Sequence, residues 1–334
     1  MFWQQLIIIT IIVNILIACG NNKSSTAKVD ETPNNPHISI EKFEFSEDSA
    51  YQYVIKQVLF GPRIPGTEGH SECANWILSK LSRWADTAFI QEGEVIRFDG
   101  KKLPIKNIIA SFGDGSDRWL LVAHWDTRPW ADQDTVRIDQ PIAGADDGAS
   151  GVAVILELAR QWSKNPPPVP VDILLVDAED QGPPVWEQIE SNPEYWALGT
   201  QYWVKNPHRP LKSFVGGILL DMVGAHNPSF LMEGISLQYA RNIVRGVWHT
   251  ASKLGYSHLF IFLEGPPVTD DHYFLNLAGI PTIDIINLNP STPHGFAPHW
   301  HTHKDSIPII SKYTLKAVGT TVGTWFNQLS NLTP

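Results

Sequence analysis

Three acidic residues follow an apolar run in the middle of the chain, in the stretch LLVDAEDQGPPVWEQ at residues 174–188. Asp177, Glu179 and Asp180 lie close together at the point where a buried strand would end. Burying an unpaired carboxylate is costly, so these side chains need a partner. The stretch therefore predicts a site at which a group of opposite charge meets the acids.

Other acids and histidines occur where further strands or loops would end. In chain order they are His124 and Asp126 after the run RWLLVAHWD, Asp146 and Asp147 in GADDG, Asp221 after SFVGGILLD, and His299, His301 and His303 in APHWHTHKD. The carboxyl ends of parallel strands meet at one edge of a sheet, where ligands bind. Oxygen and imidazole ligands that converge in a polar cleft suit zinc or a similar divalent ion.

Each of these features has a structural alternative when it is taken alone. His124 could form a hydrogen-bonded pair with Asp126, and Asp221 could be structural. The acids of GADDG could stabilise a solvated helix N-terminus. Their occurrence together, in order and at successive strand ends, favours a shared metal site.

Strand and helix patterns alternate along the chain and would place these side chains. Apolar runs predict strands at 118–126, 171–177, 213–221 and 279–287, and amphipathic patterns predict helices at 47–61, 70–84, 148–165, 237–255 and 311–329. This alternation predicts an α/β fold with a mixed, mostly parallel central sheet and helices on both faces. The chain has 334 residues, of which 43% are hydrophobic, enough for one large domain or two small ones. The formal net charge of -10, without a basic cluster, excludes nucleic acid as an expected partner.

The N-terminus reads as a leader rather than as part of the fold. Residues 1–18 are predicted to be a signal peptide, although the segment MFWQQ lacks the usual Lys or Arg. LIAC resembles a bacterial lipobox, which predicts lipidation of Cys19, and residues 19–36 would form a flexible tether. An uncleaved N-terminal anchor is the alternative. Residues 37–334 would form a single catalytic domain. With a lipid at Cys19, this domain would be anchored in the cell envelope of a Gram-negative-like bacterium, on the periplasmic side of the inner or outer membrane or at the surface.

The motifs from Phe60 to the C-terminus resemble the family of zinc aminopeptidases and glutaminyl cyclases. The segments HWD, GADDGASGVAVILELAR, DAED, LLDMVGA, DDHYFLNLAGIP and WHTHKD match that family in order. The resemblance implies an enzyme with a single α/β domain of the zinc-exopeptidase type. Members of this family catalyse one of two reactions, and the two groups of enzymes differ in the number of metal ions that they bind.

The ligand positions of the family map onto this chain residue by residue. For the aminopeptidases, which hold two zinc ions, the resemblance implies as ligands His124, Asp147 as the bridge, Asp180, Asp221 and His301, with Glu179 as the base. For the cyclases, which work with one zinc ion, it implies Asp147, Asp180 and His301. All of these residues are present, so the ligand set alone does not choose between the two chemistries.

Four side chains outside that set resemble the cyclases. Asp270, in DDH, matches an additional cyclase carboxylate, and Trp300 directly precedes His301 as it does in the cyclases. Trp186 and Phe296 match aromatic walls of the cyclase substrate pocket. Two departures from the animal cyclases are that Asp180 stands where they have Glu, and that their disulfide is missing.

The resemblance thus implies zinc-dependent cyclisation of the N-terminal glutamine of peptides or proteins to pyroglutamate, with release of ammonia. Glu179 would move protons, Asp270 would tune the proton affinity of Glu179, and Asp221 would belong to the same carboxylate network. A di-zinc aminopeptidase is the alternative enzyme. A receptor of the same fold without catalytic activity is the alternative from another functional class.

Overall fold

The computed structural model of the chain describes residues 41–329. The predicted signal peptide, Cys19 and the tether lie outside these residues. Among the described helices, none combines the length and apolar composition that a membrane crossing requires.

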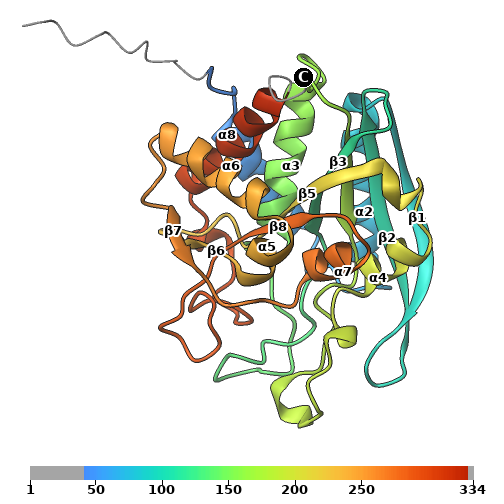
Figure 1. The fold of residues 1–334 in the computed structure, drawn as a ribbon. Helices are drawn as coiled ribbons and strands as arrows, with labels where there is room; N and C mark the ends of the chain where they lie inside the picture. Colours follow the sequence, from blue (N-terminus) through green and yellow to red (C-terminus); the bar gives the residue numbers. More distant parts are fainter. Residues whose placement is uncertain (1–40, 330–334) are drawn as a thin grey trace, which may run out of the picture. The chain divides into compact units, whose positions relative to one another are not determined.

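The core of the described chain is a six-stranded sheet with the strand order β1-β2-β4-β3-β5-β8 (Figure 1). Its strands are β1 (Thr87–Ile96), β2 (Lys102–Phe112), β3 (Arg118–His124), β4 (Val171–Val176), β5 (Phe214–Asp221) and β8 (Thr282–Ile286). β4, β3, β5 and β8 pair in parallel, whereas β2 pairs antiparallel with both β1 and β4. The prediction of a mixed, mostly parallel sheet is confirmed.

The parallel strands are apolar throughout because both of their faces are covered. Leu121 and Ala123 of β3 belong to one hydrophobic core, and Leu120 and Val122 belong to another on the opposite face of the sheet. The edge strand β1 instead alternates between exposed and partly buried residues. Its pairing with β2 was not predicted, since a half-exposed hairpin has no continuous apolar run.

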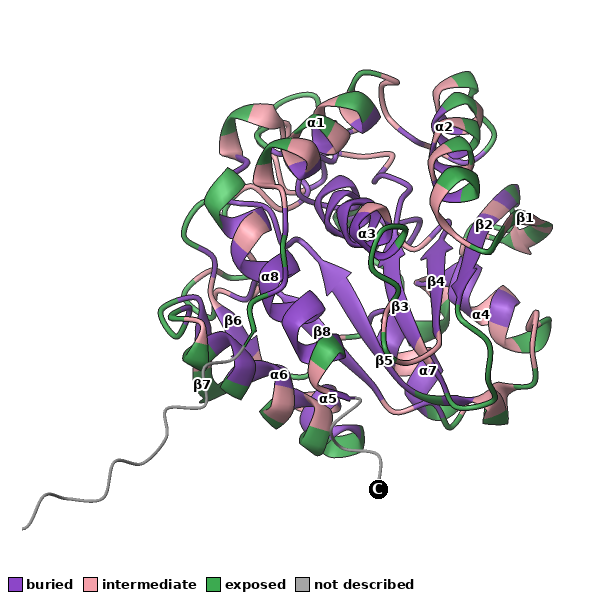
Figure 2. Cartoon of the chain, turned by 90° about the horizontal axis from the view of Figure 1, so that it is seen from above, coloured by how far each residue is buried: buried purple, intermediate pink, exposed green. Residues whose placement is uncertain are grey.

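Helices cover both faces of the sheet, as the sequence predicted. The larger core lies under α1 (Glu47–Val58), α2 (Glu68–Trp84), α3 (Ala149–Trp162), α6 (Arg241–Lys253) and α8 (Lys312–Leu329), and the smaller core lies under α4 (Leu198–Lys205) and α7 (Asp271–Leu277). α3 is buried along almost its whole length, between the sheet and the outer helices (Figure 2). Its first turn therefore has a fixed place beside the strand ends.

The helix predicted at 237–255 is divided in the structure. α5 (Gly234–Tyr239) ends at Ala240, whose φ of -134° and ψ of 34° are not helical, and α6 begins at the next residue. The amphipathic pattern runs through the break, so periodicity alone did not reveal it. A small parallel sheet of β6 (Phe230–Met232) and β7 (Phe260–Glu264), also not predicted, lies beside these helices.

Candidate active site

A cavity of about 590 Å³ lies at the carboxyl ends of the parallel strands. Its lining includes most of the residues that the sequence singled out: Asp147, Glu179, Asp180, Asp221, Asp270, Phe296, Trp300 and His301. Asp221 is the last residue of β5, and Glu179 and Asp180 follow the end of β4. The expected convergence of strand ends is therefore what the fold produces.

Asp147, Asp180 and His301 form a group whose ligand atoms lie within 4.8 Å of one another. The Nε2 atom of His301 is 3.2 Å from Oδ1 of Asp180 and 3.7 Å from Oδ2 of Asp147. Oδ2 of Asp180 is buried, and no donor in the described part of the chain reaches it. Two carboxylates and one imidazole are a donor set that zinc accepts, and a buried oxygen without a donor fits a metal ligand.

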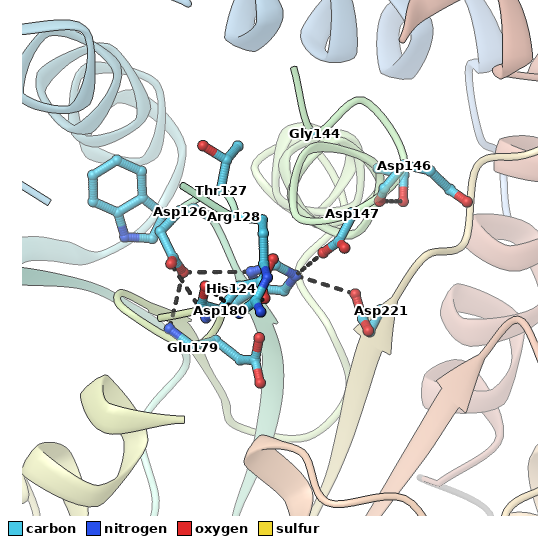
Figure 3. Close-up of polar contacts among 12 residues, drawn as sticks. His124, Asp126, Thr127, Arg128, Gly144, Asp146, Asp147, Glu179, Asp180 and Asp221 are labelled. Atoms are coloured by element: carbon cyan, nitrogen blue, oxygen red, sulfur yellow. Dashed lines mark hydrogen bonds and ion pairs between the residues drawn. The ribbon is translucent and has the colours of Figure 1, made fainter. Parts of the chain in front are cut away.

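Asp126 and Arg128 hold the loop that carries Asp180 (Figure 3). The carboxylate of Asp126 accepts hydrogen bonds from the backbone N–H groups of Glu179 at 3.0 Å and of Asp180 at 3.3 Å. The guanidinium of Arg128 lies 3.4 Å from Oδ1 of Asp180. The sequence placed Asp126 at a strand end but assigned Arg128 no role, because an arginine in a loop carries no spacing signal.

His301 is oriented by a second carboxylate that the sequence did not indicate. Its Nδ1 atom is 3.2 Å from Asp132, which is itself bound to Arg128 at 2.8 Å. Such a partner fixes the orientation of a ligating imidazole. Burial opposes the protonation of His301, but Asp180 and Asp132 raise its pKa to about 9.

Asp147 is placed by contacts from the other end of the chain. Asp305 accepts hydrogen bonds from the backbone N–H groups of Asp146 and Asp147, at 2.7 and 3.1 Å. Gly148 follows with a φ of 92°, and a Cβ atom there would lie 2.6 Å from the carbonyl oxygen of Asp126. Only glycine fits both constraints, so the motif GADDG sets the exact approach of Asp147 to the site.

His124, Asp147 and Asp221 form a second group, which shares Asp147 with the first (Figure 3). Nε2 of His124 is 3.1 Å from Asp147 and 3.2 Å from Asp221. Burial disfavours a charged His124, but its carboxylate neighbours raise its pKa well above the usual value. Burial also raises the pKa of Asp221, to about 8. The negative charge of Asp147 and Asp221 can be balanced either by a second metal ion or by protons.

Glu179 and Asp270 provide two carboxyl groups on the same cavity. Burial, followed by the charge of Asp270, raises the pKa of Glu179 well above its ordinary value. Asp270 caps α7, because its side chain accepts the backbone N–H of Asp271. Asp271 is the first residue of that helix and not its cap. A carboxyl group with a raised pKa in a cavity suits proton transfer.

Backbone strain marks several of these positions. Ala178, Met222 and His301 adopt φ values of 52°, 48° and 53°, in a region that side-chain-bearing residues rarely adopt. Ala178 directly precedes Glu179, and Met222 directly follows Asp221. Strain of this kind persists only where the surrounding structure enforces it, and it gathers at functional sites.

The aromatic wall of the cavity includes Trp300 and Phe296, whose rings lie 4.7 Å apart between centroids. The ring of Trp300 also stacks on that of His301 at 3.7 Å. Trp186, which the sequence proposed as a third wall residue, does not line this cavity and is 38% exposed. Trp196 lines the cavity instead.

The exchange of one tryptophan for the other follows from the loop after Asp180. Pro183 and Pro184 lead into a short 3-10 turn over Val185–Glu187, which carries Trp186 outward. The chain then returns, and Trp196 packs so closely on Gly182 that a Cβ atom there would lie 2.4 Å from its ring. The guanidinium of Arg128 lies 5.0 Å from the centroid of that ring. The tryptophan nearer in sequence to Glu179 and Asp180 is therefore not the one that lines the cavity.

Comparison with known proteins places this geometry among zinc enzymes. Residues 107–326 match Peptidase family M28. The structure of the glutaminyl cyclase of Bacteroides thetaiotaomicron bound to N-acetylhistamine is 46% identical, with a TM-score of 0.83, and the match covers 86% of this chain and 99% of that one. A Zn-dependent exopeptidase from Parabacteroides distasonis is 45% identical, with a TM-score of 0.82 and coverage of 86% and 98%.

Curated relatives match at lower identity and over a part of their length. Aminopeptidase YwaD of Bacillus subtilis is 28% identical over 208 residues, which is 60% of this chain and 38% of that protein. The chain spans less than half the length of the curated relatives that it matches.

Proposed function

Because the chain belongs to Peptidase family M28, we propose that it is a zinc-dependent glutaminyl cyclase that converts the N-terminal glutamine of peptides and proteins to pyroglutamate. The observation that carries the proposal is the pair of carboxyl groups, Glu179 and Asp270, on one cavity with the group Asp147, Asp180 and His301. The similarity to bacterial glutaminyl cyclases over nearly their whole length supports it.

The reaction closes a ring within one residue. The α-nitrogen of the substrate bonds to the carbon of the γ-amide, the bond from that carbon to the amide nitrogen breaks, and ammonia leaves. Glu179 accepts a proton from the α-ammonium group and donates it to the leaving nitrogen. The α-nitrogen loses a second proton when it becomes the ring amide, and the released ammonia takes up this proton to become ammonium, so the enzyme gains or loses no net proton. The raised pKa of Glu179 suits both steps near neutral pH.

Asp147, Asp180 and His301 would hold the zinc ion. When bound there, zinc would polarise the γ-carbonyl group and stabilise its developing negative charge. Trp196, Trp300 and Phe296 would contact the aliphatic part of the glutamine side chain. These contacts keep the amine near the carbonyl carbon, which matters most for an intramolecular closure.

One zinc ion per chain follows from this reading, because His124 can supply the positive charge that Asp147 and Asp221 require. The di-zinc aminopeptidase remains the second candidate. It is favoured by the complete donor group of His124, Asp147 and Asp221, and by the similarity to a protein named as a Zn-dependent exopeptidase.

The two activities are separated by offering the purified protein two peptides, one with N-terminal glutamine and one with N-terminal leucine. Mass spectrometry should show loss of ammonia from the first peptide and no change in the second. Release of free leucine would instead identify an aminopeptidase. If neither peptide changes with zinc supplied, the fold serves binding alone. Metal analysis gives a second measurement, with one tightly bound zinc ion per chain expected for the cyclase and two for the peptidase.

Trp196 and Trp186 provide a test of the pocket wall. Replacing Trp196 by alanine removes a wall that we expect the glutamine side chain to contact, so KM should rise about tenfold, the equivalent of roughly 1.4 kcal/mol. Trp186→Ala is the matched control, because this indole lies outside the cavity and its loss should change KM less than threefold. Steady-state kinetics on one glutamine peptide measure both variants, and a larger effect at Trp186 would contradict the assignment.

We also propose that lipid at Cys19 anchors the enzyme in the cell envelope. The support is the apolar run of residues 6–18 and the lipobox-like LIAC. Cys19→Ser should abolish labelling by radioactive palmitate and move the protein out of the membrane fraction, and persistence of the protein in that fraction would contradict a lipid anchor.

A further inference from the structure

Beside the cavity, several buried polar atoms lie close together and have no hydrogen-bond partner among the residues that the structure describes. They are Oδ2 of Asp270, Nδ1 of His272, and both carboxyl oxygens of Asp284. Asp270, His272 and Asp284 offer one atom each within a span of 4.8 Å. Asp284 lies on β8 and is fully buried, and none of the three residues belongs to the proposed zinc site. Buried polar atoms without partners are rare in folded proteins, so this group requires an explanation.

The carboxyl groups of Asp270 and Asp284 are within hydrogen-bonding reach of each other. Two ionised carboxylates can only accept hydrogen bonds, so the contact requires a proton on one of them. Asp270 accepts the backbone N–H of Asp271 and caps α7, an arrangement that favours its charged form. No donor among residues 41–329 reaches either oxygen of Asp284. The proton therefore belongs on Asp284.

The charges around Asp284 lead to the same assignment. It faces the carboxyl groups of Asp270, Asp221 and Glu233, and the ring of His272 lies 3.8 Å away. That ring already binds Glu233, with Nε2 at 3.0 Å. Burial, and then Asp270, Asp221 and Glu233, raise the pKa of Asp284 well above its ordinary value. Burial also raises the pKa of Asp270, but His272 and the N–H of Asp271 act against that rise.

Glu233 holds this arrangement rigid. Its carboxylate accepts hydrogen bonds from the hydroxyl of Ser236 at 2.7 Å and from the backbone N–H of Val268 at 2.8 Å, so it ties α5 to the cavity wall. The hydroxyl of Ser236 in turn accepts the backbone N–H of Asp284 at 2.9 Å. Burial opposes the ionisation of Glu233, yet His272 and Ser236 lower its pKa to about 2. Glu233 therefore stays charged, and the ring of His272 is bound to Glu233 rather than to Asp284.

We propose that Asp284 is a positioning residue that keeps its proton through the reaction and donates a hydrogen bond to Asp270, which holds Asp270 ionised and directed at Glu179. The inference rests on the proposed cyclase activity, in which Asp270 keeps the proton affinity of Glu179 high. Asp284 does not touch the substrate, since it is buried behind the cavity and does not line it.

Asparagine and alanine at position 284 test the proposal. Asp284→Ala removes the hydrogen bond and should lower kcat on glutamine peptides by about 10–100-fold, through the misplacement of Asp270. Asp284→Asn is nearly isosteric and can still donate from its amide, so it should recover most of the activity that alanine loses. Asp270→Asn is the contrasting variant, which should stay inactive because Asp270 must be an anion. Thermal melting of each variant checks that the fold is intact.

The pH profile separates this role from a purely structural one. An ionised Asp284 would raise the pKa of Glu179, so its replacement by neutral asparagine would move the acid limb of kcat/KM about one unit lower. A protonated Asp284 has no such charge, and the limb of the Asp284→Asn variant should stay within roughly 0.3 units of the wild type. An asparagine variant as inactive as alanine, a shifted limb, or a fully active alanine variant would each overturn the proposal.

Infrared spectroscopy provides a measurement that does not depend on activity. At neutral pH the wild-type protein should show a protonated carboxyl band that the Asp284→Asn variant lacks, because an amide has no such band. Its absence from the difference spectrum would place the proton elsewhere. A wild-type enzyme that releases no ammonia from glutamine peptides would instead refute the proposed function, and the infrared result would still show which state Asp284 adopts.

Discussion

Replacing Glu179 by glutamine is expected to lower kcat on N-terminal glutamine peptides by about 10²–10⁴-fold, the usual contribution of a general acid–base group. The amide of glutamine has almost the same size as the carboxyl group but cannot take a proton from the α-ammonium group. The loss should fall on kcat and leave KM within a few fold, since the pocket walls and the zinc ligands are unchanged. Steady-state kinetics combined with metal analysis would measure both quantities.

Glu187→Gln is the matched control for this variant. Glu187 lies in the same loop, eight residues along, and is exposed to solvent, so the same change of charge there should have little effect. The pH profile adds a second criterion. Glu179 acts first as a carboxylate, so wild-type activity should rise as the pH increases through its raised pKa, and the residual activity of Glu179→Gln should lack that limb. A variant with more than a tenth of the wild-type kcat would show that another group moves the proton.

The sequence predicted the metal group because chain order encodes position in a parallel sheet. Asp180 follows β4 and Asp221 ends β5, two parallel strands on either side of β3 in one sheet, so their convergence follows from the topology. His301 has no such strand before it, and its place came from family resemblance. Arg128 beside Asp180 and Trp196 in the cavity wall were not predicted, because each lies on a loop whose path depends on packing rather than on any repeating pattern.

The role of Asp284 was hidden for a related reason. In the run GIPTIDIIN it reads as one polar residue within a buried strand, and the sequence does not show which carboxyl groups its side chain meets. Its neighbours come from α5, α7 and the end of β5, which are distant along the chain. Proton sharing between carboxyl groups depends on such three-dimensional contacts, so only the folded arrangement reveals it.

Loss of a zinc ligand should have the largest effect of all. His301→Ala is expected to lower the zinc content of the protein to below a tenth of the wild-type value and to reduce cyclase activity by at least about 10³-fold, because one of three protein ligands disappears. Inductively coupled plasma mass spectrometry of the purified variant measures the metal directly. Chelation of the wild-type enzyme should give the same loss of activity, and added zinc should restore the wild type but not the variant.

Two nearby substitutions make this prediction specific. His303→Ala removes an imidazole two residues away, whose Nε2 atom lies 3.2 Å from the carbonyl oxygen of Arg137. The hydrogen bond from the backbone N–H of His303 to Asp134 does not need the side chain, so the variant should keep its zinc ion and its activity. Asp132→Ala leaves His301 in place but removes the carboxylate 3.2 Å from its Nδ1 atom, and should weaken zinc binding by roughly 10–100-fold. A graded order of affinity, with His303→Ala strongest, Asp132→Ala intermediate and His301→Ala weakest, follows only if His301 binds the metal through Nε2 and Asp132 orients it. Equal zinc content in all three variants would mean that the metal ion is held elsewhere, and His124, Asp147 and Asp221 would then be the group to test.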